Sequence, residues 1–281
     1  MRVSLFAAAV AAASALPAQA QQEPLWPRAG KFAFSVIGGA EFTLANDFSA
    51  PLNFTTSLPA LVDGSVVTIE GVDVDLVSFG FDGIYGATTD AGLEVSYGLT
   101  EAIELYVAGQ FQNATGGFLV IGNITGDPTP GVAGGGVAAP VTASLSRFRS
   151  YNVDAGARYY FLEDRLRPFI GVHGGVQFVE GIDLTLSAPN PFASAEAPFP
   201  PPFAFEDIQI FEASTEFFGG VDVGFFYAFA DNWGFAVEVG FRWTSEPDVI
   251  EGAFLGTPFD DLAVADSRLS IPIGARLQYR F

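Results

Sequence analysis

The chain has 281 residues, of which 49% are hydrophobic, 14% aromatic and only 16% charged. This composition is too apolar for a disordered protein and too poor in charge for an ordinary soluble domain. With 32 acidic and 12 basic residues the formal charge is −20, which argues against nucleic-acid binding because phosphate neutralisation needs many Lys and Arg side chains. The absence of Cys excludes disulfides, thiolate metal sites and a Cys nucleophile.

Residues 1–20 have the three parts of a secretory signal peptide. Arg2 precedes an apolar stretch from Val3 to Leu16, and Ala18-Gln19-Ala20 supplies the small residues of a cleavage site. The alternative is an N-terminal anchor, but the apolar stretch is shorter than the roughly 20 residues that a membrane-spanning helix needs. We therefore predict export, removal of residues 1–20, and a short lead over residues 21–30.

From Lys31 onward, apolar and polar residues alternate strictly in eight segments, which is typical of strands with two different faces. In the first segment Phe32, Phe34 and Val36 share one face, while Ser35 and Glu41 lie on the other. The eight segments are 31–44, 91–99, 103–111, 151–161, 170–178, 217–229, 235–243 and 269–281. Short turns alternate with long connections, and the long ones run over 45–90, 114–146, 181–214 and 247–266.

The two faces of these segments distinguish a barrel from a β-sandwich. A sandwich would present Lys, Glu and Thr to water on its second face, whereas here that face holds many glycines and a few charges. Small residues suit the narrow interior of an eight-stranded barrel, and aromatic residues gather at both ends of the segments, as in membrane barrels. We predict an all-β fold: an eight-stranded antiparallel up-and-down transmembrane β-barrel over residues 31–281, with short periplasmic turns and long extracellular loops. An exported β-sandwich is the alternative.

The C-terminal segment Leu277-Gln278-Tyr279-Arg280-Phe281 alternates apolar and polar residues and ends in Phe. With the eight alternating segments, it resembles the small outer-membrane β-barrel superfamily of Gram-negative bacteria, which includes the OmpA transmembrane domain, OmpX and OmpW. The resemblance covers residues 31–281. It implies a location in the outer membrane, contact with lipid and lipopolysaccharide, and an assembly signal at Leu277, Tyr279 and Phe281 that the barrel-assembly machinery reads. The fold does not identify the function.

Charged residues of both signs have the parity of the barrel interior. Burial of an isolated charge is costly, so their nearly matched numbers predict a paired network. This network either holds the barrel shut as a plug or exchanges partners as a gate; inward aromatic residues at 106, 160, 169 and 226 also obstruct the lumen. The predicted network consists of Glu94, Glu104, Asp154, Asp222 and Glu238 with Arg158, Arg242, Arg268 and Arg276.

His173 is the only His and also has inward parity. Barrel enzymes that use His need a Ser or Asp beside it, and none lies within a few residues along this strand. Gly175 occupies the place where a lipid A deacylase-like pattern has Ser. A partner on a neighbouring strand remains open, but we expect no enzymatic activity and no cofactor.

The long connections contain 18 of the 32 acidic residues and no Lys or Arg, which predicts an acidic, cation-attracting outer rim. A functional alternative is that Asp73, Asp75, Asp260 and Asp261 are ligands of divalent cations, which are held alone or bridge to lipopolysaccharide phosphates. Phe79 and Phe81 keep the parity of residue 93, so the first connection is expected to form a protruding hairpin that extends the second strand. The Pro-rich segment 189–203 is expected to be stiff and to have no sheet pairing of its own.

These features favour a structural protein of the cell envelope. The main alternatives are a narrow cation-preferring channel and an OmpW-like passage for small hydrophobic molecules. A surface adhesin that binds through its acidic loops is the third candidate.

Overall fold

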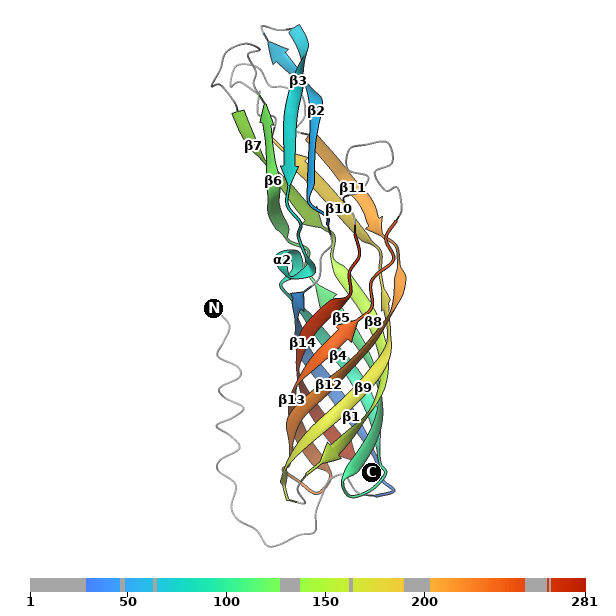
Figure 1. The fold of residues 1–281 in the computed structure, drawn as a ribbon. Coiled ribbons are helices and arrows are strands. Elements are labelled where there is room, and N and C mark those ends of the chain that lie inside the picture. Colours follow the sequence, from blue (N-terminus) through green and yellow to red (C-terminus); the bar gives the residue numbers. More distant parts are fainter. Residues whose placement is uncertain are drawn as a thin grey trace.

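A computed structural model of the chain describes residues 29–45, 49–62, 65–126, 137–161, 164–189, 203–250, 262 and 264–281. The expected signal peptide, most of the Pro-rich segment, and Asp260 and Asp261 lie outside these residues. The chain forms a long, narrow structure in which a closed barrel continues at one end into a second sheet (Figure 1).

Eight strands close the barrel in the order β1-β14-β13-β12-β9-β8-β5-β4, and all neighbours are antiparallel. Their bounds are β1 Phe32–Ala45, β4 Ala87–Gly98, β5 Ile103–Ala114, β8 Phe148–Tyr160, β9 Leu166–Val179, β12 Ser214–Ala228, β13 Trp233–Thr244 and β14 Arg268–Arg280. The first and last strands pair along their whole length, from Ala33 opposite Arg280 to Ala45 opposite Leu269. The predicted eight-stranded antiparallel barrel is confirmed.

Short turns join consecutive barrel strands at one end. In the β4–β5 turn, Thr100 Oγ1 accepts hydrogen bonds from the backbone N–H groups of Ala102 and Ile103, at 3.1 and 2.9 Å. A hydroxyl that bonds its own backbone in this way stabilises a tight reversal. These turns lie at the same end as the C-terminus (Figure 1).

The long connections are not simple loops, because three of them form a six-stranded antiparallel sheet with the order β11-β10-β7-β6-β3-β2. Its strands are β2 Leu52–Val62, β3 Ser65–Leu76, β6 Phe118–Gly126, β7 Val137–Leu145, β10 Ile182–Ala188 and β11 Phe203–Phe211. The expected protruding hairpin is confirmed as β2–β3. The expectation that segment 189–203 has no sheet pairing is wrong at its last residue, since Phe203 pairs with Ala188.

The predicted extension of the second strand through Phe79 and Phe81 is also wrong. A single helical turn, α2 (Phe81–Tyr85), interrupts it, and Gly86 follows with a positive φ of 65°. That backbone region is open to glycine but unfavourable for other residues, so the chain changes direction there before β4 begins. α2 lies at the junction of barrel and sheet (Figure 1). Its residues Phe81, Ile84 and Tyr85 are buried.

The six-stranded sheet has one apolar and one polar face. Alternate residues Leu184 and Leu186 of β10 are almost fully buried, whereas Asp73 and Asp75 of β3 are exposed on the opposite face. The buried side chains form one core with α2 and with Phe148 at the start of β8. Across the part of the chain that the structure describes, no helix is long and apolar enough to span a bilayer.

Candidate functional site

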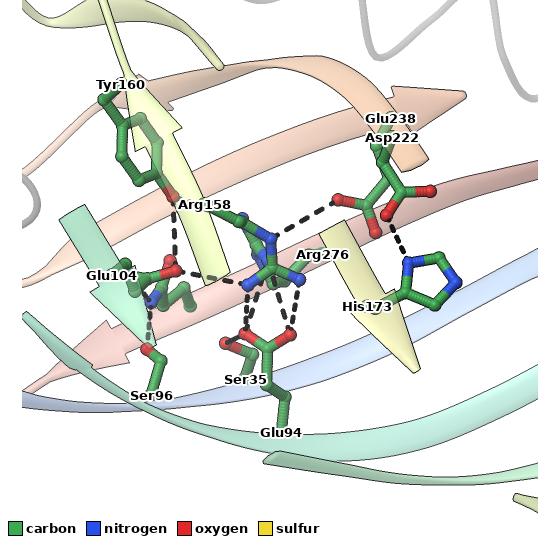
Figure 2. A network of polar contacts seen from close by, with 11 residues as sticks. Ser35, Glu94, Ser96, Glu104, Arg158, Tyr160, His173, Asp222, Glu238 and Arg276 are labelled. Atoms are coloured by element: carbon green, nitrogen blue, oxygen red, sulfur yellow. Dashed lines mark hydrogen bonds and ion pairs between the residues drawn. The ribbon is translucent and has the colours of Figure 1, made fainter. Parts of the chain in front are cut away.

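The centre of the barrel holds a network of buried ion pairs (Figure 2). Arg158 Nη2 lies 2.7 Å from Glu94 Oε2, and Arg158 Nη1 lies 3.2 Å from Glu104 Oε1. Arg276 Nη1 also contacts Glu94 Oε1, at 3.3 Å. Glu238 is the most exposed member of the network, and its Oε2 lies 3.9 Å from Arg158 Nε. One guanidinium group therefore connects three carboxylates from three different strands.

Glycine makes room for this network. Tyr106 on β5 pairs with Gly156 on β8, and a Cβ at position 156 would lie 2.6 Å from the tyrosine ring. The ring therefore lies flat over the glycine, and the guanidinium carbon of Arg158 is 3.7 Å from its centroid. This contact adds a cation–π interaction to the ion pairs and fixes the direction of Arg158.

The short-turn end of the lumen is closed by aromatic side chains. Tyr160, Phe169 and Phe226 are at most 2% exposed, as their inward parity predicts. The Tyr160 hydroxyl donates to Glu104 Oε1 at 3.2 Å, which joins this aromatic layer to the ion pairs. Gln278 donates to Glu104 Oε2 at 3.1 Å and to Ser96 Oγ at 2.9 Å.

A second group of contacts lies nearer the six-stranded sheet and centres on Glu41. Its Oε2 accepts hydrogen bonds from Arg242 Nη1 at 2.8 Å and from Gln112 Nε2 at 2.9 Å, and its Oε1 accepts one from Ser270 Oγ at 2.5 Å. Glu41 was absent from the predicted network although its parity in the first strand already placed it inward. Including it would have supplied the partner that Arg242 has in the structure.

Arg268 lies at the mouth of the barrel beneath the apolar core. Its guanidinium carbon is 4.9 Å from the Phe81 ring centroid and 5.5 Å from that of Phe148. Glu216, which the sequence analysis also missed, lies 3.9 Å away. Aromatic side chains of α2 and β8 therefore pack at the mouth of the barrel.

His173 has the cross-strand partner that the sequence left open. Its Nδ1 lies 2.7 Å from Asp222 Oδ2 on the adjacent strand β12 (Figure 2). Both residues line an internal cavity of about 50 Å³ between the two groups of ion pairs. Asp154 also lines this cavity, but its Oδ1 is buried without a hydrogen-bond partner among the described residues.

All nine residues of the predicted network therefore face the lumen, but they do not form a single cluster. Glu94, Glu104, Arg158, Glu238 and Arg276 contact one another. Arg242 and Arg268 pair with Glu41 and Glu216 instead, Asp222 pairs with His173, and Asp154 lies at the cavity. Parity placed each residue on the correct face, whereas the pairing depends on the register between strands.

The acidic residues of the outer sheet form pairs with neutral side chains. Asp73 accepts a hydrogen bond from Thr55 at 2.8 Å, and Asp75 accepts one from Asn53. No group of three or more His, Cys, Asp or Glu side chains in the described ranges is arranged to hold a metal ion. The expected cation site at Asp73 and Asp75 stays a prediction without geometric support.

No protein-family model matches the chain, and no curated protein matches it. Among solved structures, the Neisserial surface protein A is 12% identical, covers 90% of this chain and 98% of its own, and has a TM-score of 0.35. The outer-membrane protease OmpT of Escherichia coli is 8% identical over 94% and 99% of the two chains, with a TM-score of 0.35. The outer-membrane protein W of Escherichia coli is 15% identical over 90% and 99%, with a TM-score of 0.26. All three scores are below 0.5, so the architecture described above rests on the strand order of this chain itself.

Proposed function

We propose that this protein is an integral outer-membrane β-barrel with a structural role in the cell envelope and a closed, salt-bridged lumen. In this arrangement the short turns face the periplasm, and the six-stranded sheet projects from the cell surface. Lipid and lipopolysaccharide surround the barrel wall, and the barrel-assembly machinery inserts it after residues 1–20 are removed.

A continuous apolar belt around the barrel carries this proposal. Each barrel strand contributes an outward aliphatic residue that is between 42% and 56% exposed: Val36, Leu93, Val107, Val153, Val172, Val223, Val239 and Ile273. In water such a closed belt would drive aggregation, whereas in a bilayer it meets hydrocarbon. Every backbone hydrogen bond of a closed barrel is satisfied within the sheet, which lipid requires.

Aromatic residues at the edges of the belt support the same placement. Tyr159, Phe161 and Trp233 are exposed near the short turns, and Phe217 and Trp243 are exposed near the long connections. Aromatic side chains at both boundaries are typical of membrane barrels because their amphipathic rings sit at the lipid–water interface.

The absence of Cys makes the topology directly testable. Thr55→Cys places a thiol on the exposed face of the outer sheet, and Glu101→Cys places one in an exposed short turn. With a membrane-impermeant maleimide on intact cells, we expect only the first variant to be labelled, and both to be labelled after the outer membrane is permeabilised. Labelling of both on intact cells, or recovery of the protein in the soluble periplasm, would contradict the proposal.

A cation-conducting channel is the second candidate, and the acid-rich cavity at the centre of the barrel favours it. Conduction would require the contacts of Arg158 and the aromatic layers at both ends to open. We expect the refolded wild type to be silent in a planar bilayer, with folding checked by a heat-dependent gel shift. Steady cation-selective openings that change in the Arg242→Ala and Glu238→Ala variants would support the channel instead.

A further inference from the structure

The cavity at the centre of the barrel carries an excess of negative charge. It is lined by the six carboxylates of Glu41, Asp90, Glu94, Asp154, Asp222 and Glu238. Only two guanidinium groups line it, those of Arg158 and Arg242, and Arg276 reaches Glu94 from outside the lining. Uncompensated charge in a low-dielectric interior is strongly unfavourable, so this excess needs either protons or a bound cation.

Four buried polar atoms of residues that line this cavity have no hydrogen-bond partner among the described residues: Asp154 Oδ1, Glu238 Oε2, His173 Nε2 and Arg242 Nε. Asp154 is 4% exposed, and the side chain of His173 is also 4% exposed. Buried polar atoms are rarely left unpaired, so several at one cavity indicate a bound ligand, and the two that could serve a cation and its water are Asp154 Oδ1 and His173 Nε2. The imidazole packs against Gly220, since a Cβ there would lie 2.8 Å from Nε2, so only glycine leaves room for this ring.

The contact between His173 and Asp222 orients the imidazole for such a ligand. When Nδ1–H donates to Asp222 Oδ2 at 2.7 Å, the neutral ring presents the lone pair of Nε2. A carboxylate that fixes the tautomer of a His in this way is typical of sites where the other nitrogen faces a metal ion or its water.

The size of the cavity and the arrangement of its donors limit the type of ion. A cavity of about 50 Å³ is large enough for several water molecules. No three His, Cys, Asp or Glu side chains within the described ranges are placed to bind a bare ion, so the ion must keep part of its water shell. Mg²⁺ dehydrates reluctantly and usually keeps several of its waters, so it suits a site with few protein ligands.

We propose that the central cavity binds one partly hydrated Mg²⁺, with Asp154 as its carboxylate ligand and His173 Nε2 accepting a hydrogen bond from metal-bound water. Asp222 acts as a positioning residue for His173. The ion balances the carboxylate excess and stabilises the closed lumen. This inference depends only on the closed barrel and would stand whichever cellular function is correct.

The test compares thermal unfolding of the mature protein, refolded in detergent micelles, in Mg²⁺ and in EDTA with choline chloride at equal ionic strength. We expect saturating Mg²⁺ to raise the unfolding temperature of the wild type by roughly 5 °C or more. Asp154→Asn and His173→Gln should lose most of this rise. The double variant Asp73→Asn and Asp75→Asn, on the outer sheet, should keep it.

Asp154→Asn also has an expected effect in EDTA. Because the substitution removes one uncompensated charge with almost no change in shape, this variant should unfold at a higher temperature than the wild type when no divalent cation is present. A higher unfolding temperature in EDTA would show that Asp154→Asn is folded, so that loss of its Mg²⁺ response is not caused by misfolding. A wild type that does not respond to Mg²⁺ but is stabilised on acidification would overturn the proposal in favour of protonated carboxylates, and a Mg²⁺ response that survives both substitutions would overturn it in favour of surface binding.

Discussion

Arg158 Nη2 lies 2.7 Å from Glu94 Oε2, although 64 positions separate the two residues in the sequence and their side chains are only 4% and 1% exposed. The pair joins β8 to β4 across the lumen. Arg158 also contacts Glu104, and Glu94 also contacts Arg276. Its strength depends on this shielding from water, because the same pair on the surface would contribute little.

Substitution Arg158→Met should therefore be severely destabilising. It leaves Glu94 and Glu104 without their main counter-charge, and breaking a buried pair typically lowers the free energy of unfolding by about 3–5 kcal/mol. Urea titration of the protein folded into lipid vesicles measures the change. The matched control is Arg149→Met, because Arg149 lies 3.5 Å from Glu180 with both side chains nearly half exposed; its loss should cost less than about 1 kcal/mol. Equal effects of the two substitutions would show that the central network contributes no more than a surface pair.

Gly156→Ala should disturb the lumen, whereas Gly109→Ala should not. A Cβ at position 156 would lie 2.6 Å from the Tyr106 ring and 2.5 Å from the Val172 carbonyl oxygen, but one at position 109 meets nothing within 4 Å. We expect the first substitution to cost about 1–3 kcal/mol of unfolding free energy through overpacking. The second should change it by less than about 0.5 kcal/mol. Both positions lie on the paired strands β5 and β8, so a larger loss at 109 than at 156 would contradict the described packing.

Tyr85→Phe should loosen the junction between the barrel and the outer sheet. The Tyr85 hydroxyl donates to the Ser146 carbonyl oxygen at 2.8 Å, and its loss should cost about 0.5–1.5 kcal/mol near neutral pH. Unfolding measured in urea at several pH values gives the difference between the variant and the wild type.

That difference should shrink at high pH. Burial, with a smaller effect of Asp183, raises the pKa of Tyr85 above its usual value, so the folded state holds the proton after the unfolded state has released it. The stability that this group contributes is complete below the unfolded pKa of about 10 and is lost as the pH rises above it. The phenyl ring of the variant has no proton to lose, so a difference that is constant up to about pH 11 would contradict the burial of this hydroxyl.

Phe281→Ala should affect assembly more than stability. Phe281 is 70% exposed, and its ring contacts that of Tyr279 with centroids 5.3 Å apart, so its removal takes away little packing. We expect a change in unfolding free energy below about 1 kcal/mol but a much lower yield of folded protein in the outer membrane of living cells. The heat-dependent gel shift of membrane fractions measures the yield, and Phe161→Ala, at another exposed ring near the short turns, is the control. Equal losses of yield in both variants would contradict a specific assembly signal.

Strand periodicity by itself determined the barrel. Side chains of a strand alternate between two faces, so the positions of Phe34, Glu94 and Arg276 relative to wall and lumen follow from counting residues within one segment. The number of alternating segments and the short turns between them indicated eight antiparallel strands. Local alternation does not depend on any distant contact, which is why these features could be predicted.

The tertiary structure alone decided which charges meet and how the long connections fold. The pairing of Glu41 with Arg242, 201 positions away, and of His173 with Asp222 depends on the register and stagger of strands around a closed barrel, and alternation on one strand carries no information about either. The same holds for β10 and β11, which pair within a sheet that strands of the neighbouring connections complete. The predicted long strand is interrupted at α2, and Gly86 follows the helix with a positive φ. A positive φ cannot be read from a pattern of apolar residues, so the sequence did not reveal this interruption.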